Sequence, residues 1–177
     1  MSDEMEAIKL NIGETVMYST TGLCKVADIV TRIVLGKSRE YYVLSPVYHE
    51  RSTCFVPVDY DSIRIRIERP LSKEQAEELL EFIADSSPAK WIAQINDRKL
   101  QYSAIARGSD RKEKVKLIKA LTIYQFQLLE QNKRLNTSDE QILNKCKEQI
   151  ICELAFVLEK TTDEIEKVFE KSVSKYV

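Results

Sequence analysis

The sequence predicts an α+β protein of two domains, a small curled antiparallel sheet or half-barrel followed by an all-helical bundle. Two observations lead to this prediction. Before Pro70, β-branched residues, turn residues and period-two alternation dominate, whereas after Pro70 apolar residues recur at helical spacing. The 177 residues, 44% of them hydrophobic, are enough for one compact domain or two small ones. We therefore place the domain boundary near Pro70.

Five strands are expected before the boundary. The clearest is Ile63–Ile67, where isoleucines occupy one face and arginines the other. Turn residues separate four further apolar or β-branched runs, which lie around Thr15–Ser19, Leu23–Leu35, Glu40–Val47 and Thr53–Val58. Five short strands in about sixty residues are typical of a small curled sheet.

Helix start signals follow the boundary. Four residue pairs match a capping box, in which a side chain and a backbone N–H satisfy each other. These pairs are Ser72 with Gln75, Asp110 with Glu113, Ser138 with Gln141, and Thr161 with Glu164. Pro88 after Ser87 predicts a fifth start, because proline is preset for the first helical position. About five helices are therefore expected.

The predicted helices each have one apolar face to bury. The faces comprise Ala76, Leu79, Leu80 and Ile83; Leu117, Leu121, Tyr124 and Leu128; Ile142, Cys146, Ile150, Leu154 and Val157; and Ile165, Val168, Phe169 and Tyr176. Each buried Leu, Ile or Phe stabilises the fold by about 1.5–3 kcal/mol. The helical part is therefore expected to be an independent bundle.

The sequence does not predict an enzyme. The four cysteines form no C-x-x-C pair, and His49 is the only histidine, which argues against metal sites and histidine-based catalysis. Four glycines leave little room for a phosphate-binding loop. We expect no catalytic residue, cofactor, metal or small-molecule substrate. No run reaches the roughly 20 apolar residues that span a bilayer, and the acidic start lacks signal-peptide character, so we expect a cytoplasmic protein.

Charge is distributed unevenly, although the net charge is only −1. Between Lys90 and Lys119 there are nine basic residues against three acidic ones, and the preceding stretch from Glu74 to Asp85 is acidic. Such a run is most often a solvated helix face. It is also the pattern of a surface that contacts nucleic-acid phosphates. Both interpretations stay open at this point.

Trp91, the only tryptophan, lies in the expected opening turn of a basic helix that begins at Pro88. One hypothesis makes it a core anchor with Ile92, Ile95 and Tyr102. The other makes it an exposed apolar wedge that enters a distorted DNA groove. In the second case its neighbours Lys90, Arg98 and Lys99 would supply phosphate contacts, which position a protein without reading sequence.

Several short segments follow one another in a distinctive order and spacing along the chain. In the first part these are Ile12–Tyr18, Gly22, Val26, Tyr41–Leu44 and Val56–Val58. In the second part they are Trp91, Asp97–Arg98, Lys116–Leu121 and Glu153–Ala155. In this order and spacing the segments resemble the CarD/CdnL family of bacterial transcription regulators, and the resemblance runs from about Ile8 to Tyr176. The family shares its first domain with transcription-repair coupling factors.

The resemblance implies a Tudor-like or SH3-like β domain over residues 8–69 that binds the RNA polymerase β subunit, and a DNA-contacting helical domain over residues 71–177. The family's tryptophan enters the minor groove at the upstream edge of the transcription bubble, where it favours the open complex. By spacing, that tryptophan is Trp91. Arg32 aligns with a basic position that the family uses at the polymerase surface.

The chain departs from the family pattern at some of these positions. Phe55 stands where some members carry an arginine facing polymerase, and Ala93 and Gln94 follow Trp91 where arginines are usual. We expect Arg32 and Phe55 at the polymerase surface, and DNA contact that is weak and independent of base sequence. The alternative is a protein-interaction adaptor that uses the same β module without touching DNA.

Overall fold

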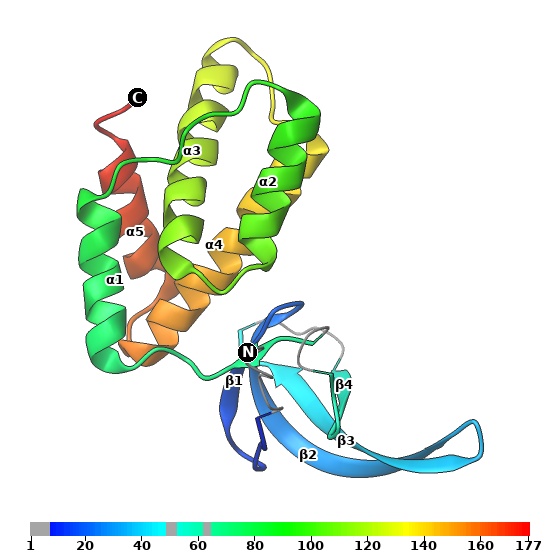
Figure 1. Ribbon diagram of the computed structural model, residues 1–177. Helices are drawn as coiled ribbons and strands as arrows, with labels where there is room; N and C mark the ends of the chain where they lie inside the picture. The colour runs from blue at the N-terminus through cyan, green and yellow to red at the C-terminus, as the bar shows by residue number, and fades with distance from the viewer. Residues whose placement is uncertain (1–7, 49–52, 62–64) are drawn as a thin grey trace, which may run out of the picture. The chain divides into compact units, whose positions relative to one another are not determined.

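The computed structural model describes residues 8–48, 53–61 and 65–177. Contacts divide the chain into two compact units, Met1–Pro70 and Leu71–Val177, which are described separately below. Within the described residues, the first unit holds a five-stranded antiparallel sheet and the second holds five helices (Figure 1). The predicted fold class is confirmed.

The β unit consists of β1 (Thr15–Tyr18), β2 (Gly22–Val34), β3 (Lys37–Pro46), β4 (Cys54–Pro57) and β5 (Ile67–Glu68). The strand order in the sheet is β4-β3-β2-β1-β5. Four strands match their predicted ranges closely. Of the predicted strand Ile63–Ile67, only Ile67 belongs to β5. Ile65 and Arg66 are not in a strand, and the N–H of Ile65 donates to the Asp61 carbonyl instead. Residues 62–64 and His49 lie outside the described residues.

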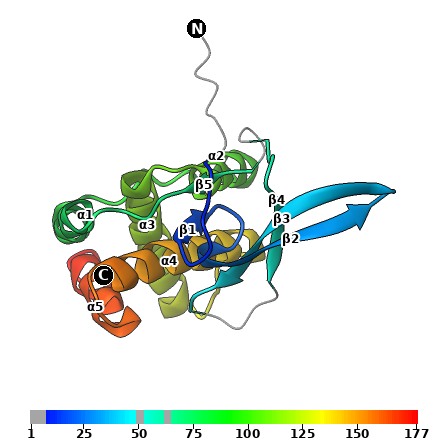
Figure 2. The ribbon, with the colours of Figure 1, turned by 90° about the horizontal axis from the view of Figure 1, so that it is seen from below.

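One face of the sheet carries the core of the β unit. Its buried members are Leu10, Val16, Cys24, Val26, Tyr42, Leu44, Val56, Tyr60 and Ile67. Two tyrosine hydroxyls bind the segment before β1 to this core. The N–H of Ile8 donates to Tyr60 Oη at 2.8 Å, and the N–H of Leu10 donates to Tyr42 Oη at 3.2 Å. A register shift between Val26 and Asp28 lies where β2 leaves the core and continues into a long hairpin with β3 (Figure 2).

The helical unit consists of α1 (Lys73–Asp85), α2 (Ile95–Arg107), α3 (Arg111–Glu130), α4 (Thr137–Val157) and α5 (Thr162–Val173). The capping boxes predicted at Ser72 and Thr161 are confirmed, and Asp110 caps α3 by accepting from the N–H of Glu113. The prediction at Ser138 was wrong by two residues. Asn136 is the N-cap, because its side chain accepts from the N–H of Asp139.

The helix predicted from Pro88 does not form there. Residues 86–94 are non-helical, and α2 begins at Ile95. The carbonyls of this segment find partners in side chains that come later in the sequence: Tyr102 donates to the Lys90 carbonyl, and Arg98 donates to those of Ile92 and Ala93. These hydrogen bonds from side chains satisfy the backbone carbonyls without a helix. The helix start that Pro88 predicts from its local sequence therefore does not form.

The predicted apolar faces meet in one core. Figure 1 shows α1 beside α5 and α2 on the opposite side of α3 and α4. Ala76, Leu79 and Ile83 are buried as predicted, and so are the main positions of the later helices: Leu117, Leu121, Ile142, Cys146, Ile150, Leu154, Ile165 and Phe169. Tyr176 was predicted to belong to this core, but it lies beyond the end of α5 and is exposed.

Candidate functional site

The sheet face opposite the β core is the first candidate surface. The register pairs Val30 with Tyr41, Arg32 with Arg39, and Val43 with Phe55. Because paired residues of neighbouring strands point to the same side of a sheet, and residues two apart along a strand do as well, these side chains share one face. We call this set, Val30, Arg32, Arg39, Tyr41, Val43 and Phe55, the outer face. It lies away from the buried Tyr42 and Leu44, and all of its members are exposed or only partly buried.

Arg32 and Phe55, both predicted from the sequence to contact polymerase, lie together on the outer face. The Arg32 guanidinium carbon is 3.5 Å from the centre of the Phe55 ring, which is a cation–π contact. Phe55 nevertheless leaves 39% of its surface exposed. The contact joins a cation and an apolar ring into one exposed patch, and aromatic and arginine side chains are the residue types enriched at protein interfaces.

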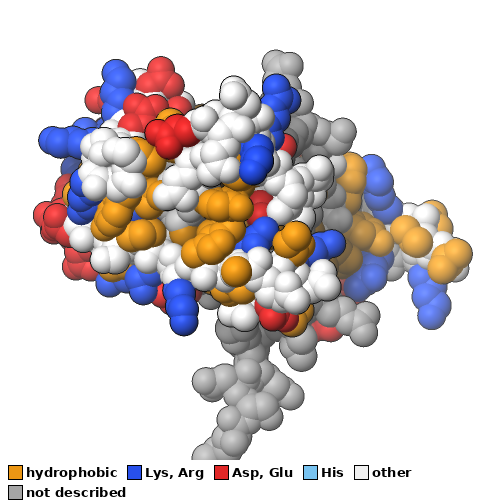
Figure 3. Space-filling view, turned by 90° about the horizontal axis from the view of Figure 1, so that it is seen from above, with side chains coloured by type: hydrophobic (Ala, Val, Ile, Leu, Met, Phe, Trp, Pro, Cys, Tyr) orange, Lys and Arg blue, Asp and Glu red, His pale blue; other side chains and the backbone are white. Residues whose placement is uncertain are grey.

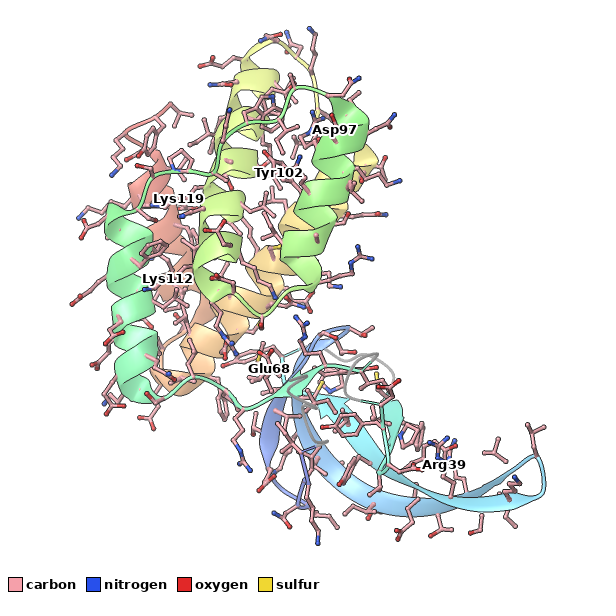
Figure 4. The ribbon with its side chains drawn as sticks, in the orientation of Figure 1. Arg39, Glu68, Asp97, Tyr102, Lys112 and Lys119 are labelled. Carbon is pink, nitrogen blue, oxygen red and sulfur yellow. The ribbon has the colours of Figure 1, made fainter. Side chains whose placement is uncertain are left out.

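Arg39 extends the charged part of the outer face. Its Nε donates to Asp59 Oδ1 at 2.8 Å (Figure 4). The hydrogen bond from Arg39 lowers the pKa of the Asp59 carboxyl below its usual value, and the same bond raises the pKa of Arg39. Both side chains are largely exposed, so the pair orients Arg39 more than it stabilises the fold.

Strand β4 lies at one edge of the sheet formed by the described strands. Among the described strands, β4 pairs only with β3. A free strand edge presents backbone N–H and C=O groups that a strand of another protein can pair with. Phe55 lies on this strand, so the edge and the cation–π pair are adjacent.

Trp91 is the centre of the second candidate surface, in the helical unit. It is partly buried against the helical core, so it is neither the fully buried anchor of the first hypothesis nor the fully exposed wedge of the second. Its ring centre is 3.8 Å from that of Tyr124 and 6.3 Å from that of Tyr102. Ile92 also packs on the core, whereas Ile95 is exposed. Trp91 is thus held in place by aromatic neighbours and is only partly buried.

Arg98 is a structural residue, which corrects the expectation that it contacts phosphate. Only 4% of its surface is exposed. Its Nε and Nη2 donate to the carboxylate of buried Asp139 at 2.9–3.2 Å, and its Nη1 donates to two carbonyls of the Trp91 segment. The guanidinium carbon also lies 4.6 Å from the centre of the Trp91 ring. Arg98 therefore holds the segment that carries Trp91 and is not available to DNA in this conformation.

The basic run between Lys90 and Lys119 does not form one surface. Lys114 and Lys119 are buried with Arg98, and Lys119 Nζ donates to the Ser86 carbonyl at 2.6 Å. Burial lowers the pKa of Lys119. Lys90 and Lys99 are exposed, as the phosphate-contact hypothesis requires. Figure 3 shows basic side chains scattered among hydrophobic and acidic ones on the face that it displays.

The buried acidic partners were missed from the sequence. Glu153, only 1% exposed on its side chain, accepts two hydrogen bonds from Arg111 and one from the N–H of Leu71. A signal was present, because Glu153 lies three residues after Ile150 and Asp139 three before Ile142. Both therefore fall on the predicted apolar face of α4. An acidic residue at a core position indicates a buried partner.

Two further properties bear on the type of site. Within the described parts of the chain, no group of three or more His, Cys, Asp or Glu side chains is placed to hold a metal ion. No helix among these residues is both long enough and apolar enough to cross a membrane.

Comparison with known proteins concerns the β unit. Residues 10–67 match the family model of the CarD-like/TRCF RID domain, the RNA polymerase-interacting domain of transcription-repair coupling factors. A comparison with curated proteins gives no match. The resemblance inferred from the sequence is confirmed over the matched residues, while its extension through the helical unit stays a prediction. Residues 10–67 therefore belong to the CarD-like/TRCF RID domain family, which indicates a transcription-related protein that interacts with RNA polymerase.

Proposed function

We propose that this protein is a bacterial, cytoplasmic transcription regulator that binds the β subunit of RNA polymerase through its β unit. The observation that carries the proposal is the exposed Arg32–Phe55 pair on a domain of the RNA polymerase-interacting family. The pair supplies a desolvatable ring and a cation, and the adjacent β4 edge supplies backbone hydrogen-bonding groups. No catalytic step is part of this function.

Reversing the charge at Arg32 tests the docking surface. Arg32→Glu removes the cation–π contact and places a carboxylate on the outer face, so affinity for purified RNA polymerase should fall by tenfold or more in an equilibrium binding measurement. Lys9→Glu is the matched control, because Lys9 is an exposed base of the same unit that precedes β1 and lies on no strand of the sheet. Equal binding by wild type and Arg32→Glu would refute the assignment.

We further propose that the helical unit contacts promoter DNA at the upstream edge of the bubble and stabilises the open complex. The accessible part of Trp91 would lie against a distorted minor-groove step, and Lys90 and Lys99 would contact phosphates. Stabilisation requires tighter contact with melted than with closed DNA, since only a difference in affinity shifts the equilibrium. Docking on polymerase raises the local concentration, so weak DNA affinity suffices.

The alternative is an adaptor that binds polymerase and never touches DNA. The burial of Arg98 and the packing of Trp91 on Tyr124 favour it, because both reduce what is offered to a groove. Salt dependence distinguishes the two functions, since phosphate contacts release counterions. DNA contact predicts that polymerase-bound protein protects bubble-containing duplex in a salt-sensitive way.

Lys90→Glu/Lys99→Glu provides the decisive variant, because both side chains are exposed and their loss leaves the core intact. Open-complex lifetime should shorten and its salt slope should fall by about two. Lys160→Glu/Lys171→Glu, two other exposed lysines of the same unit, is the control. An unchanged lifetime in the first variant, with polymerase binding retained, would establish the adaptor instead.

A further inference from the structure

The end of the β2–β3 hairpin carries apolar side chains that are not packed against the core of the β unit. From Thr31 to Val34, β2 pairs only with β3 among the described strands, because β1 pairs with an earlier part of β2 and β4 pairs with a later part of β3. Figure 2 shows this end projecting beyond the remainder of the sheet. Ile33 is 79% exposed and Leu35 98% exposed. Burial inside the β unit therefore explains neither side chain.

The turn itself does not favour leucine. Leu35 and Gly36 connect the strands as a two-residue loop, and both have positive φ, 51° and 75°. This is the pattern of a type I′ turn, in which Asn-Gly is the preferred pair because a β-carbon is disfavoured at positive φ. A leucine there is both conformationally unfavourable and fully solvated. Such a combination at a projecting tip is typical of a side chain kept for a contact.

Charge around the tip has one sign. From Ile29 to Arg39 the hairpin carries Arg32, Lys37 and Arg39 and no acidic residue. The tip is also continuous with the outer face, because Arg32 precedes Leu35 by three residues, about 10 Å along the strand. A partner that covers the Arg32–Phe55 pair therefore reaches the tip as well. The positive charge predicts an acidic rim on the partner's surface.

We propose that the hairpin tip, Ile33, Val34 and Leu35, is an anchor that inserts Leu35 into an apolar socket with an acidic rim on RNA polymerase. The inference rests on the proposed docking of the β unit and adds a second, separable contact to it. A leucine that passes from full solvent exposure into a pocket acts as a central interface residue, whereas Arg32 and Lys37 supply orientation at the edge.

Leu35→Asn tests the anchor without disturbing the turn. Asparagine is preferred in this turn position, so thermal stability should be unchanged or raised. Affinity for purified RNA polymerase core enzyme should nevertheless weaken by roughly tenfold or more, the effect of exposing one leucine that was buried in a complex. Leu35→Met should retain most of the affinity. Leu129→Asn, an exposed leucine of the helical unit, is the control and should bind as wild type does.

The outcomes separate this inference from the function on which it rests. Loss of binding in Arg32→Glu with wild-type binding in Leu35→Asn would overturn the anchor and leave docking of the outer face intact. Absence of binding by the wild type would overturn both. Binding of the wild type to phosphatidylglycerol vesicles, lost in Leu35→Asn while polymerase affinity is unchanged, would assign the tip to a lipid surface and also refute the anchor.

Discussion

The two units use the same residue types in opposite ways. In the β unit, Arg32 lies on Phe55 at the surface, and Ile33 and Leu35 are exposed at the hairpin tip. In the helical unit, Arg98 lies near Trp91 in the interior, and every buried polar or charged side chain found among the described residues belongs to this unit: Arg98, Lys114, Lys119, Asp139, Gln149, Glu153 and Ser172. The β unit therefore exposes its arginine and part of the aromatic ring beside it, whereas the helical unit buries its arginine and packs Trp91 partly against the core.

This difference explains why the two halves of the proposed function have unequal support. A buried ion pair costs desolvation and is kept where its geometry is good, as for Arg98 and Asp139. Its charges are then unavailable to phosphate. The proposed nucleic-acid contact of the helical unit therefore depends on the exposed bases Lys90 and Lys99 near Trp91, whereas the surface that we propose for polymerase lies within the β unit.

The largest expected effect comes from Arg98→Ala. This change leaves the Asp139 carboxylate buried without its cation and frees the Trp91 segment, so the helical unit should lose about 3–5 kcal/mol of stability. Urea unfolding followed by the fluorescence of Trp91 measures the loss. Lys99→Ala, the exposed neighbour, should change stability by less than about 0.5 kcal/mol. A loss below 1 kcal/mol in Arg98→Ala would contradict the structural role of Arg98.

A pH effect should follow from Cys146 in α4. Burial raises the pKa of this thiol from 9.0 to about 11. An acid with a raised pKa contributes stability below its unfolded pKa and loses it as pH rises through the folded one, so the loss falls between pH 9 and pH 11. In Cys146→Ala, the free energy of unfolding should therefore fall by about 2–3 kcal/mol less than in the wild type over this pH range. Parallel stability curves for both proteins from pH 7 to 11 would refute this.

The capping box of α5 should have a smaller effect. Thr161→Ala removes the side-chain acceptor for the N–H of Glu164, which costs about 1 kcal/mol at a typical N-cap. Thermal unfolding by circular dichroism should show a lower midpoint, and Thr161→Ser should restore it. An unchanged midpoint in Thr161→Ala would mean that packing alone holds the start of α5.

The smallest effect on folding is expected from Arg32→Ala, the counterpart of Arg98→Ala. An exposed cation–π contact contributes about 0.5–1 kcal/mol, so amide-exchange protection in the β unit should change by no more than this. Polymerase binding should fall all the same. If Arg32→Ala instead unfolds the β unit, the contrast between the two units is lost.

Much of the fold could be predicted because its signals are local. Apolar and β-branched runs bounded by turn residues located four strands, and the boxes at Ser72 and Thr161 marked the starts of α1 and α5. Each of these signals depends on residues at most a few positions apart. The box predicted at Ser138 failed because Asn136 caps two residues earlier, a competition between two local signals of similar strength.

The pairing of Arg32 with Phe55 could not be predicted from the pattern. These residues lie 23 positions apart, and only the pairing of β2 and β4 on either side of β3 brings the Arg32 side chain over the Phe55 ring. The resemblance named both residues for their family positions, without indicating that they touch. The exposure of Leu35 at the hairpin tip could not be predicted either. A leucine at the end of an apolar run has the same local sequence pattern whether its side chain is buried or exposed.

By itself, the sequence determined the class and order of the elements, because periodicity and capping act over one or two helical turns and are encoded in neighbouring residues. Only the tertiary structure decided which charges are surface and which are core. Asp139 and Glu153 draw Arg98 and Arg111 inward from more than 40 positions away, and the same Arg98 bonds keep the Trp91 segment out of a helix. Such choices depend on desolvation and on partners brought together by folding, which no local pattern records.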